Sequence, residues 1–215
     1  MASDLLDDYV HRFLGYGNPE ASLWHVGMEE AGNPETMPKR LSIWQQRGSK
    51  IFEDSAEFKL LIDPENIYFR ADNRVQFTLN RMIRLEFGYT GLEILTALDV
   101  RRYQQAAWGK FDGKSAAIEL SAVPRRSLGQ DYPYSTKRAF NEFLRQERTD
   151  FIAENIKKYR PRDVVFYGTS KKYTAFWKVI TEKCMDQSTN FHIVEHPNSR
   201  KWNLDRYHGF GKLIP

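Results

Sequence analysis

Apolar residues follow two kinds of spacing along this chain. Short apolar runs bounded by glycine or proline are typical of buried strands, whereas apolar residues that recur every three to four positions are typical of helices. We predict strands where the first pattern occurs, in residues 21–27, 115–123, 162–168 and 190–197. Pro124 lacks the amide hydrogen that a central ladder needs, so we expect the second strand to end there.

Helical spacing fills much of the remaining sequence. The clearest predicted helices, with the expected N-cap where the sequence offers one, are residues 3–15 (Ser3), 73–88 (Asn73), 135–159 (Ser135 and Thr136) and 170–184. We expect the second to close at Gly88. The long third helix has an apolar stripe for burial, made of Ala139, Phe140, Phe143, Ile152 and Ile156.

The order of these elements indicates the fold class. Strand and helix alternate, which is the order of a parallel sheet with helices on both faces. We therefore expect an α/β fold with three layers, α/β/α, around a central, mostly parallel four-stranded sheet. Residues 38–108 are mostly helical and less regular, and we interpret them as a helical insertion in a single domain spanning residues 1–215.

Composition and charge narrow the class of protein. No apolar run approaches the roughly 20 residues that cross a bilayer. The acidic amino terminus does not have the basic and apolar regions of a secretory signal, so we expect a soluble, cytoplasmic protein. Cys184 is the only cysteine, which excludes an internal disulfide. Residues 121–215 hold 18 basic and 10 acidic residues, and this excess favours a polyanionic partner.

Chemically useful side chains gather where the predicted strands end. In open α/β sheets ligands bind at the carboxyl ends of the strands. The four ends are Gly27-Met28-Glu29-Glu30, the stretch from Ser121 to Ser127, Gly168-Thr169-Ser170, and His196-Pro197-Asn198-Ser199-Arg200. Together they supply two acids, a histidine, hydroxyls and cations, which suits acid–base chemistry on an anionic substrate.

Each of these residues also has an ordinary structural interpretation. Glu29 and Glu30 are also consistent with solvated acids near a helix start, and His196 with a polar residue that ends a strand. His192 and His196 lie four residues apart on one strand face, a spacing that is also compatible with a metal site. The basic residues are also consistent with surface charge, and Trp202 with packing. No phosphate-binding or dinucleotide glycine motif is present.

Taken in order, the stretches "VGMEEAG", "IELSAVPRRS", "DVVFYGTSKKY" and "HIVEHPNSR" resemble the uracil-DNA glycosylase superfamily. The resemblance spans roughly residues 18–203, and its best single match is His196-Pro197-Asn198-Ser199. It departs from the family pattern at Ser121, where several members have asparagine, and in the first loop, which has no proline or nearby stacking aromatic. Trp44 is the one aromatic that we considered as a substitute.

The resemblance implies a DNA glycosylase that needs no metal or other cofactor, binds single- or double-stranded DNA and is monomeric. By position, Glu29 would orient or activate water, with Glu30 as the alternative, and His196 would stabilise the leaving base. Base-binding roles fall to Gly27, Met28, Ser121 and Asn198. DNA-binding roles fall to Arg125, Arg126, Lys171, Ser199, Arg200, Lys201 and Trp202.

Two other functions stay open at this point. A nucleic-acid-binding relative with the same fold but no catalysis is suggested by Ser121 and by the altered first loop. A metal-dependent hydrolase would use Glu29, Glu30, His192 and His196. The sequence does not specify which base would be removed.

Overall fold

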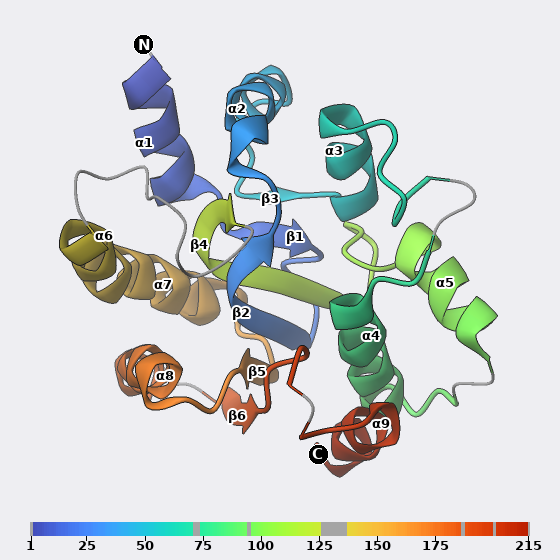
Figure 1. Cartoon of the computed structure of the whole chain (residues 1–215). Helices are drawn as coiled ribbons and strands as arrows, with labels where there is room; N and C mark the ends of the chain where they lie inside the picture. Colours follow the sequence, from blue (N-terminus) through green and yellow to red (C-terminus); the bar gives the residue numbers. More distant parts are fainter. Residues whose placement is uncertain are drawn as a thin grey trace.

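A computed structural model describes residues 2–70, 74–93, 96–125, 137–185, 188–199 and 201–214 (Figure 1). Its centre is a six-stranded mixed sheet with the strand order β3-β1-β4-β2-β5-β6. The α/β class is therefore confirmed, whereas the predicted number of four strands is wrong. Among the described helices, none is both long enough and apolar enough to cross a membrane.

The four predicted strands form the parallel part of the sheet. They are β2 (Leu23–Ala31), β4 (Ser115–Arg125), β5 (Asp163–Tyr167) and β6 (Asn190–Val194). β2 lies between β4 and β5, and β6 forms one edge. Because the four strands run parallel, their carboxyl ends all lie at the same end of the sheet.

Two short strands complete the sheet and were not predicted. β1 (Gly15–Gly17) runs antiparallel to β4, and β3 (Phe52–Glu53) runs parallel to β1. Strands of three and two residues are too short to show an alternating pattern, so nothing in the hydrophobic spacing marks them. β3 also lies inside the stretch predicted as a helical insertion.

The two longest strands extend beyond their predicted ends. β2 continues to Ala31, so both Glu29 and Glu30 belong to the strand itself. β4 continues through Pro124, and Arg125 pairs with Ala31. The register shifts between Glu29 and Ala31, which is the mark of a β-bulge. Pro124 is tolerated because it lies past this irregularity, where the regular ladder has already ended.

Helices cover both faces of the sheet. One core cluster receives Trp24, Val26 and Met28 from β2 and lies under α1 (Ala2–Arg12), α2 (Met37–Gln46), α3 (Ser55–Ile62), α6 (Lys137–Phe143), α7 (Thr149–Tyr159) and α8 (Lys171–Lys183). The other receives Leu23 and lies under α4 (Phe77–Tyr89), α5 (Ala97–Ala106) and α9 (Leu204–Leu213). A three-residue 3-10 helix, Pro34–Thr36, leads into α2.

The predicted long helix is broken by a π-helical segment. α6 and α7 are separated by Leu144–Arg148, and the expected Ser135 and Thr136 caps lie outside the described residues. Arg148 is fully buried and donates to the carbonyls of Leu120, Val10 and Glu119, at 2.9, 3.0 and 2.9 Å. We attribute the local π turn to this residue, because the extra residue in the turn lets the guanidinium reach three backbone acceptors.

The end of α4 packs closely against α9. A Cβ atom at Gly88 would lie 2.0 Å from the carbonyl oxygen of His208, and one at Gly211 would lie 2.1 Å from that of Leu85. Gly88 therefore permits helix packing and does not end the helix, which runs on to Tyr89. The helix begins at Phe77, and the predicted cap Asn73 lies outside the described residues.

Candidate functional site

Parallel pairing brings the carboxyl ends of the four strands together in one row, which we call the carboxyl edge of the sheet. Glu29 is the register partner of Ser121, and Gly27 is the partner of Glu119 on the same strand, β4. On the other side of β2, Tyr167 pairs with Val194 at the ends of β5 and β6, so the segments that follow emerge at this edge too. The ends of the four predicted strands therefore do lie along a common edge.

Glu30 is engaged by a compact ionic cluster. Arg40 of α2 donates to both of its carboxylate oxygens at 3.2 Å, and Lys59 of α3 lies 3.3 Å away. The Tyr16 hydroxyl donates to Glu30 at 2.5 Å, while Arg40 donates to the hydroxyls of Tyr16 and Tyr9 at 2.8 and 3.4 Å. The side chains of Arg40 and Glu30 are only 5% and 13% exposed. We call Tyr16, Glu30, Arg40 and Lys59 the Glu30 cluster.

The pKa values in this cluster follow from its charges. Burial by itself disfavours the Glu30 carboxylate, but Arg40 and Lys59 outweigh burial and lower the pKa of Glu30 to about 2. Burial raises the pKa of Tyr9 to about 12, so this hydroxyl stays protonated. Glu30 is thus a fixed anion between two cations, and this arrangement ties the helices α2 and α3 to the end of β2.

Glu29 has a different environment. It is half-buried, and its side chain has no hydrogen bond or ion pair among the described residues. Burial raises the pKa of Tyr173, in the first turn of α8, and of Glu119 of β4, and the charge of Glu29 adds to both shifts. The two consecutive glutamates therefore differ in how their charges are compensated. Arg40 and Lys59 neutralise Glu30, whereas the Glu29 carboxylate remains available to a ligand or a water molecule.

Glu119 adds a third carboxyl group that the sequence prediction missed. Its carboxyl lies directly over Gly27, where a Cβ atom would be 2.8 Å from Oε2. Oε2 is enclosed and has no hydrogen-bond partner among the described residues. Burial, reinforced by the charges of Glu30 and Glu29 and opposed by Lys59, raises the pKa of Glu119 to about 8. A charged residue in the otherwise apolar stretch "AAIELSAV" was the available signal.

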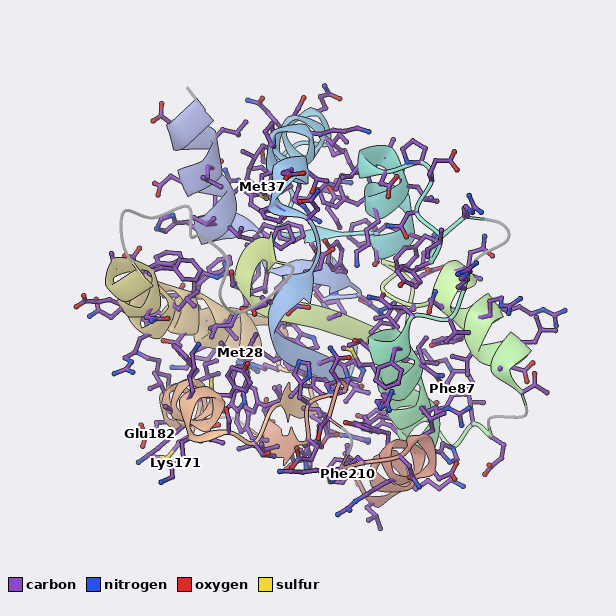
Figure 2. The ribbon with its side chains drawn as sticks, in the orientation of Figure 1. Met28, Met37, Phe87, Lys171, Glu182 and Phe210 are labelled. Atoms are coloured by element: carbon purple, nitrogen blue, oxygen red, sulfur yellow. The ribbon has the colours of Figure 1, made fainter. Side chains whose placement is uncertain are left out.

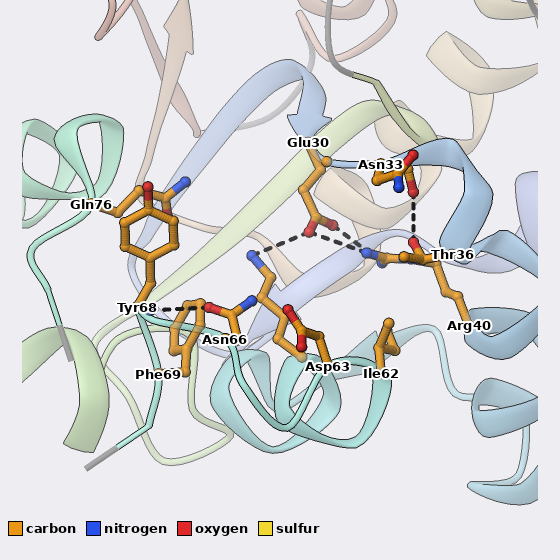
Figure 3. A pocket seen from close by; sticks show the side chains of 12 residues that line it. Glu30, Asn33, Thr36, Arg40, Ile62, Asp63, Asn66, Tyr68, Phe69 and Gln76 are labelled. Carbon is orange, nitrogen blue, oxygen red and sulfur yellow. Dashed lines mark hydrogen bonds and ion pairs between the residues drawn. The ribbon is translucent and has the colours of Figure 1, made fainter. Parts of the chain in front are cut away.

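A cavity of about 250 Å³ opens beside the Glu30 cluster (Figure 3). Its walls come from residues 30–40, at the end of β2 and the start of α2, from residues 59–69, and from Gln76. Phe69 and Tyr68 provide aromatic rings, and Asn66 and Gln76 provide amides. The aromatic residue considered from sequence, Trp44, is instead fully buried in the core and donates to the carbonyl of Lys50 at 2.7 Å.

His196 is held in a defined orientation after β6. The backbone N–H of Asn198 donates to His196 Nδ1 at 3.1 Å, so in the neutral ring the proton resides on Nε2. Burial lowers the pKa of His196, which favours this neutral form. Thr78 of α4 donates to the Asn198 side chain at 2.9 Å, and the backbone of Ser199 donates to the carbonyl of His196 at 2.7 Å. The neutral His196 ring therefore presents a single N–H donor, at Nε2.

The residues predicted to bind the base differ in their exposure to solvent. Met28 is 5% exposed and packs in the core (Figure 2), so its side chain does not reach the edge. Ser121 is buried, and its hydroxyl lies 3.4 Å from both the N–H and the carbonyl oxygen of Val123. Gly27 makes room for Glu119, and Asn198 is exposed.

The predicted DNA-binding residues are only partly described. Lys171 is exposed at the start of α8, on the periphery in Figure 2. Lys201 is 72% exposed and pairs with Glu195 at 3.2 Å, and its backbone N–H donates to Ser199 at 3.2 Å. Trp202 packs against Tyr207 and Phe210. Arg126, Arg200 and the side chain of Arg125 lie outside the described residues.

The residues considered for a metal site do not converge. The Nε2 atom of His192 lies 2.9 Å from Asp163, which begins β5 at the opposite end of the strand. Within the described part of the chain, His192 makes no hydrogen bond with Glu29 or Glu30. Across the described residues, no group of three or more histidine, cysteine, aspartate or glutamate side chains has an arrangement that could hold a metal ion.

Comparisons with models of protein families, with curated proteins and with solved structures gave no match to this chain. The functional conclusion therefore depends on the geometry of the site and on the resemblance of its motifs.

Proposed function

We propose that the protein is a DNA glycosylase of the uracil-DNA glycosylase type, which hydrolyses the N-glycosidic bond of a flipped base. The observation that carries the proposal is the contrast at the end of β2. Glu29 lies at the carboxyl edge of the parallel sheet, in register with Ser121, and no cation pairs with it among the described residues, whereas Glu30 is already neutralised. A half-buried carboxylate at this edge, unpaired within the described part of the chain, is suited to activating water.

The proposed chemistry assigns one task to each end of the breaking bond. A base inside a duplex is inaccessible, so the nucleotide must first leave the stack. Breaking the bond leaves positive charge on the sugar and negative charge on the base. Glu29 would stabilise the sugar and accept a proton from the attacking water. His196, fixed by Asn198 with its proton on Nε2, would donate a hydrogen bond to the base.

Exposed cations near the same edge would position the DNA. Lys171 and Lys201 follow the ends of β5 and β6, respectively, and both are exposed. Contacts of this kind neutralise phosphates, which gives affinity that falls with salt and carries no sequence preference. We place these two lysines on the DNA-facing side of the protein.

The test is base release from oligonucleotides that carry uracil, hypoxanthine, xanthine or modified cytosines, in single- and double-stranded form. We expect Glu29→Gln to slow release by about 10²- to 10⁴-fold, and His196→Ala to slow it by roughly 10²- to 10³-fold. Glu154→Gln, which removes one exposed acid from α7, serves as the control and should leave the rate unchanged.

Two results would contradict the proposal. One is an absence of release from every substrate by the wild-type protein, and the other is release that survives Glu29→Gln. The buried hydroxyl of Ser121 favours one alternative in particular, a relative that binds nucleic acid without cleaving it. In that case DNA binding would persist in Glu29→Gln, with no base released by any variant.

A further inference from the structure

Glu119 occupies a place that the proposed chemistry has not yet used. Its carboxyl lies over Gly27, and Oε2 has no hydrogen-bond partner among the described residues. The charges of Glu30 and Glu29 both act on it. Gly27 leaves the space that the carboxyl fills, and Arg148 binds the backbone carbonyl of Glu119 at 2.9 Å, which anchors the main chain at this position. An unpaired carboxyl group beside two other acids is suited to donating a proton.

We propose that Glu119 is a second catalytic residue, the general acid that protonates the departing base, and that the preferred substrates are purine-derived bases. This inference rests on the proposed glycosylase function. Glu29 is one strand away and has no paired cation among the described residues, so the two carboxyls can take the opposite roles of base and acid. Hydrolytic enzymes that cleave glycosidic bonds commonly divide the work between two carboxyl groups in this way.

The step balances as follows for a purine. The C1′–N9 bond breaks and its electron pair stays on the base, while the Glu119 carboxyl gives its proton to a ring nitrogen such as N7. Water forms the new bond to C1′ and passes a proton to Glu29. Solvent then returns a proton to Glu119 and removes one from Glu29, so that both groups regain their starting state.

The same step restricts the substrate. A purine presents a ring nitrogen with a free lone pair, the N7 acceptor, and leaves as a neutral molecule once it is protonated. Uracil in a nucleotide has no such nitrogen and departs as an anion. An acid in the site therefore assists purine-derived bases far more than uracil, and hypoxanthine is the probe that we select.

The charges around Glu119 set its pH range. Glu29 and Glu30 face it from β2, Lys59 faces it from α3, and Arg148 approaches its backbone from the π-helical segment. Burial and the two acids outweigh Lys59 and raise the pKa of Glu119 to about 8. The acid form is accordingly present at neutral pH and disappears as the pH rises through that value.

The experiment measures single-turnover release of hypoxanthine and of uracil between pH 5 and 9.5. Wild-type release of hypoxanthine should fall as the pH rises through about 8. Glu119→Gln should slow it by roughly 10²- to 10⁴-fold at pH 7 and abolish that decline, with Glu119→Asp retaining part of the rate and the decline. Uracil release should change much less, and Glu154→Gln should match the wild type for both bases.

Failure of the inference can be told from failure of the proposed function. Hypoxanthine release that is the same in Glu119→Gln as in the wild type overturns the inference and leaves the glycosylase intact. Release of no base by the wild type overturns both. A carbon-13 titration of the Glu119 carboxyl needs no activity: we expect its midpoint near 8, and a midpoint in the ordinary range for glutamate would refute the acid role.

Discussion

Two neighbouring glutamates at the end of one strand have opposite surroundings. Glu30 is held by Arg40, Lys59 and Tyr16, with its charge fully compensated. The Glu29 side chain has no hydrogen bond or ion pair within the described part of the chain, and Glu119 of the neighbouring strand also has an unpaired carboxyl oxygen there. The difference teaches that a pair of acids in a sequence can divide into one whose charge is compensated by the protein and one whose side chain stays unpaired in the described part of the chain. The division is made by helices that arrive from elsewhere in the chain.

The largest difference between the two glutamates is expected in stability, when each of the two charges is removed separately. Glu30→Gln leaves Arg40 and Lys59 buried without their anion, and breaking such a pair costs about 3–5 kcal/mol. For a protein of this size that corresponds to a fall in Tm of roughly 6–20 °C. Thermal unfolding of Glu30→Gln beside Glu29→Gln provides the measurement. Glu29→Gln should stay within about 0.5 kcal/mol of the wild type, and a similar loss in both variants would erase the distinction.

The pH dependence of stability separates Glu119 from Glu30. A raised pKa means that the folded protein binds more protons than the unfolded chain, so Glu119 lowers stability progressively from about pH 4.5 to about pH 8. Glu119→Gln should therefore be more stable than the wild type above pH 8, by on the order of a few kcal/mol, and nearly equal to it at pH 4.5. Glu30 has the opposite sign: its contribution is present above about pH 4.5 and is lost as the pH falls towards 2. Denaturant titrations at several pH values test both signs.

A smaller effect tests whether Gly27 exists to accommodate Glu119. Gly27→Ala places a Cβ atom 2.8 Å from Glu119 Oε2 and should cost about 1–3 kcal/mol. Gly209 in α9 has open space around a Cβ atom, so Gly209→Ala is the control and should stabilise by about 0.4–1 kcal/mol.

The double variant Gly27→Ala/Glu119→Ala completes this test. Because the colliding carboxyl is gone, Gly27→Ala should cost much less in this background than in the wild type. An unchanged cost would show that the glycine is required for some other reason.

The smallest expected effect concerns the lysines that we propose to contact DNA. Lys201→Ala should leave stability within about 0.5 kcal/mol of the wild type, because the lysine side chain is 72% exposed. It should reduce the slope of log affinity against log salt by about 0.9 if the lysine contacts a phosphate. Lys183→Ala, on the far end of α8, is a matched control that should leave the slope unchanged. Equal slopes for Lys201→Ala and the wild type would remove Lys201 from the interface.

Local signals predicted much of the fold. The apolar runs located β2, β4, β5 and β6, and the helical spacing located α1, α4, α7 and α8, because burial of whole faces leaves a periodic trace in the sequence. The short strands β1 and β3 and the break at Arg148 leave no such trace. Their causes are contacts between distant segments, such as the bond from Arg148 to Val10.

The candidate site was predictable to a similar extent. Glu29 and His196 could be proposed because motif order places them at strand ends. The roles of Glu30 and Glu119 could not be assigned, since they depend on which cations reach them from α2 and α3. The same limit applies to Ser121: its position at a strand end was predicted, but its burial was not.

Arg148 has a consequence for how the chain folds. Its guanidinium donates to carbonyl groups that lie 138, 29 and 28 positions away in the sequence. The charge can give up its hydration only when the amino-terminal helix, the strand β4 and the π-helical segment have all docked, since a buried cation without acceptors is costly. We therefore expect these bonds to form after the main barrier, with φ-values near zero at this position. Arg148 therefore acts as a late lock, which joins the amino-terminal helix to β4 after both have already formed.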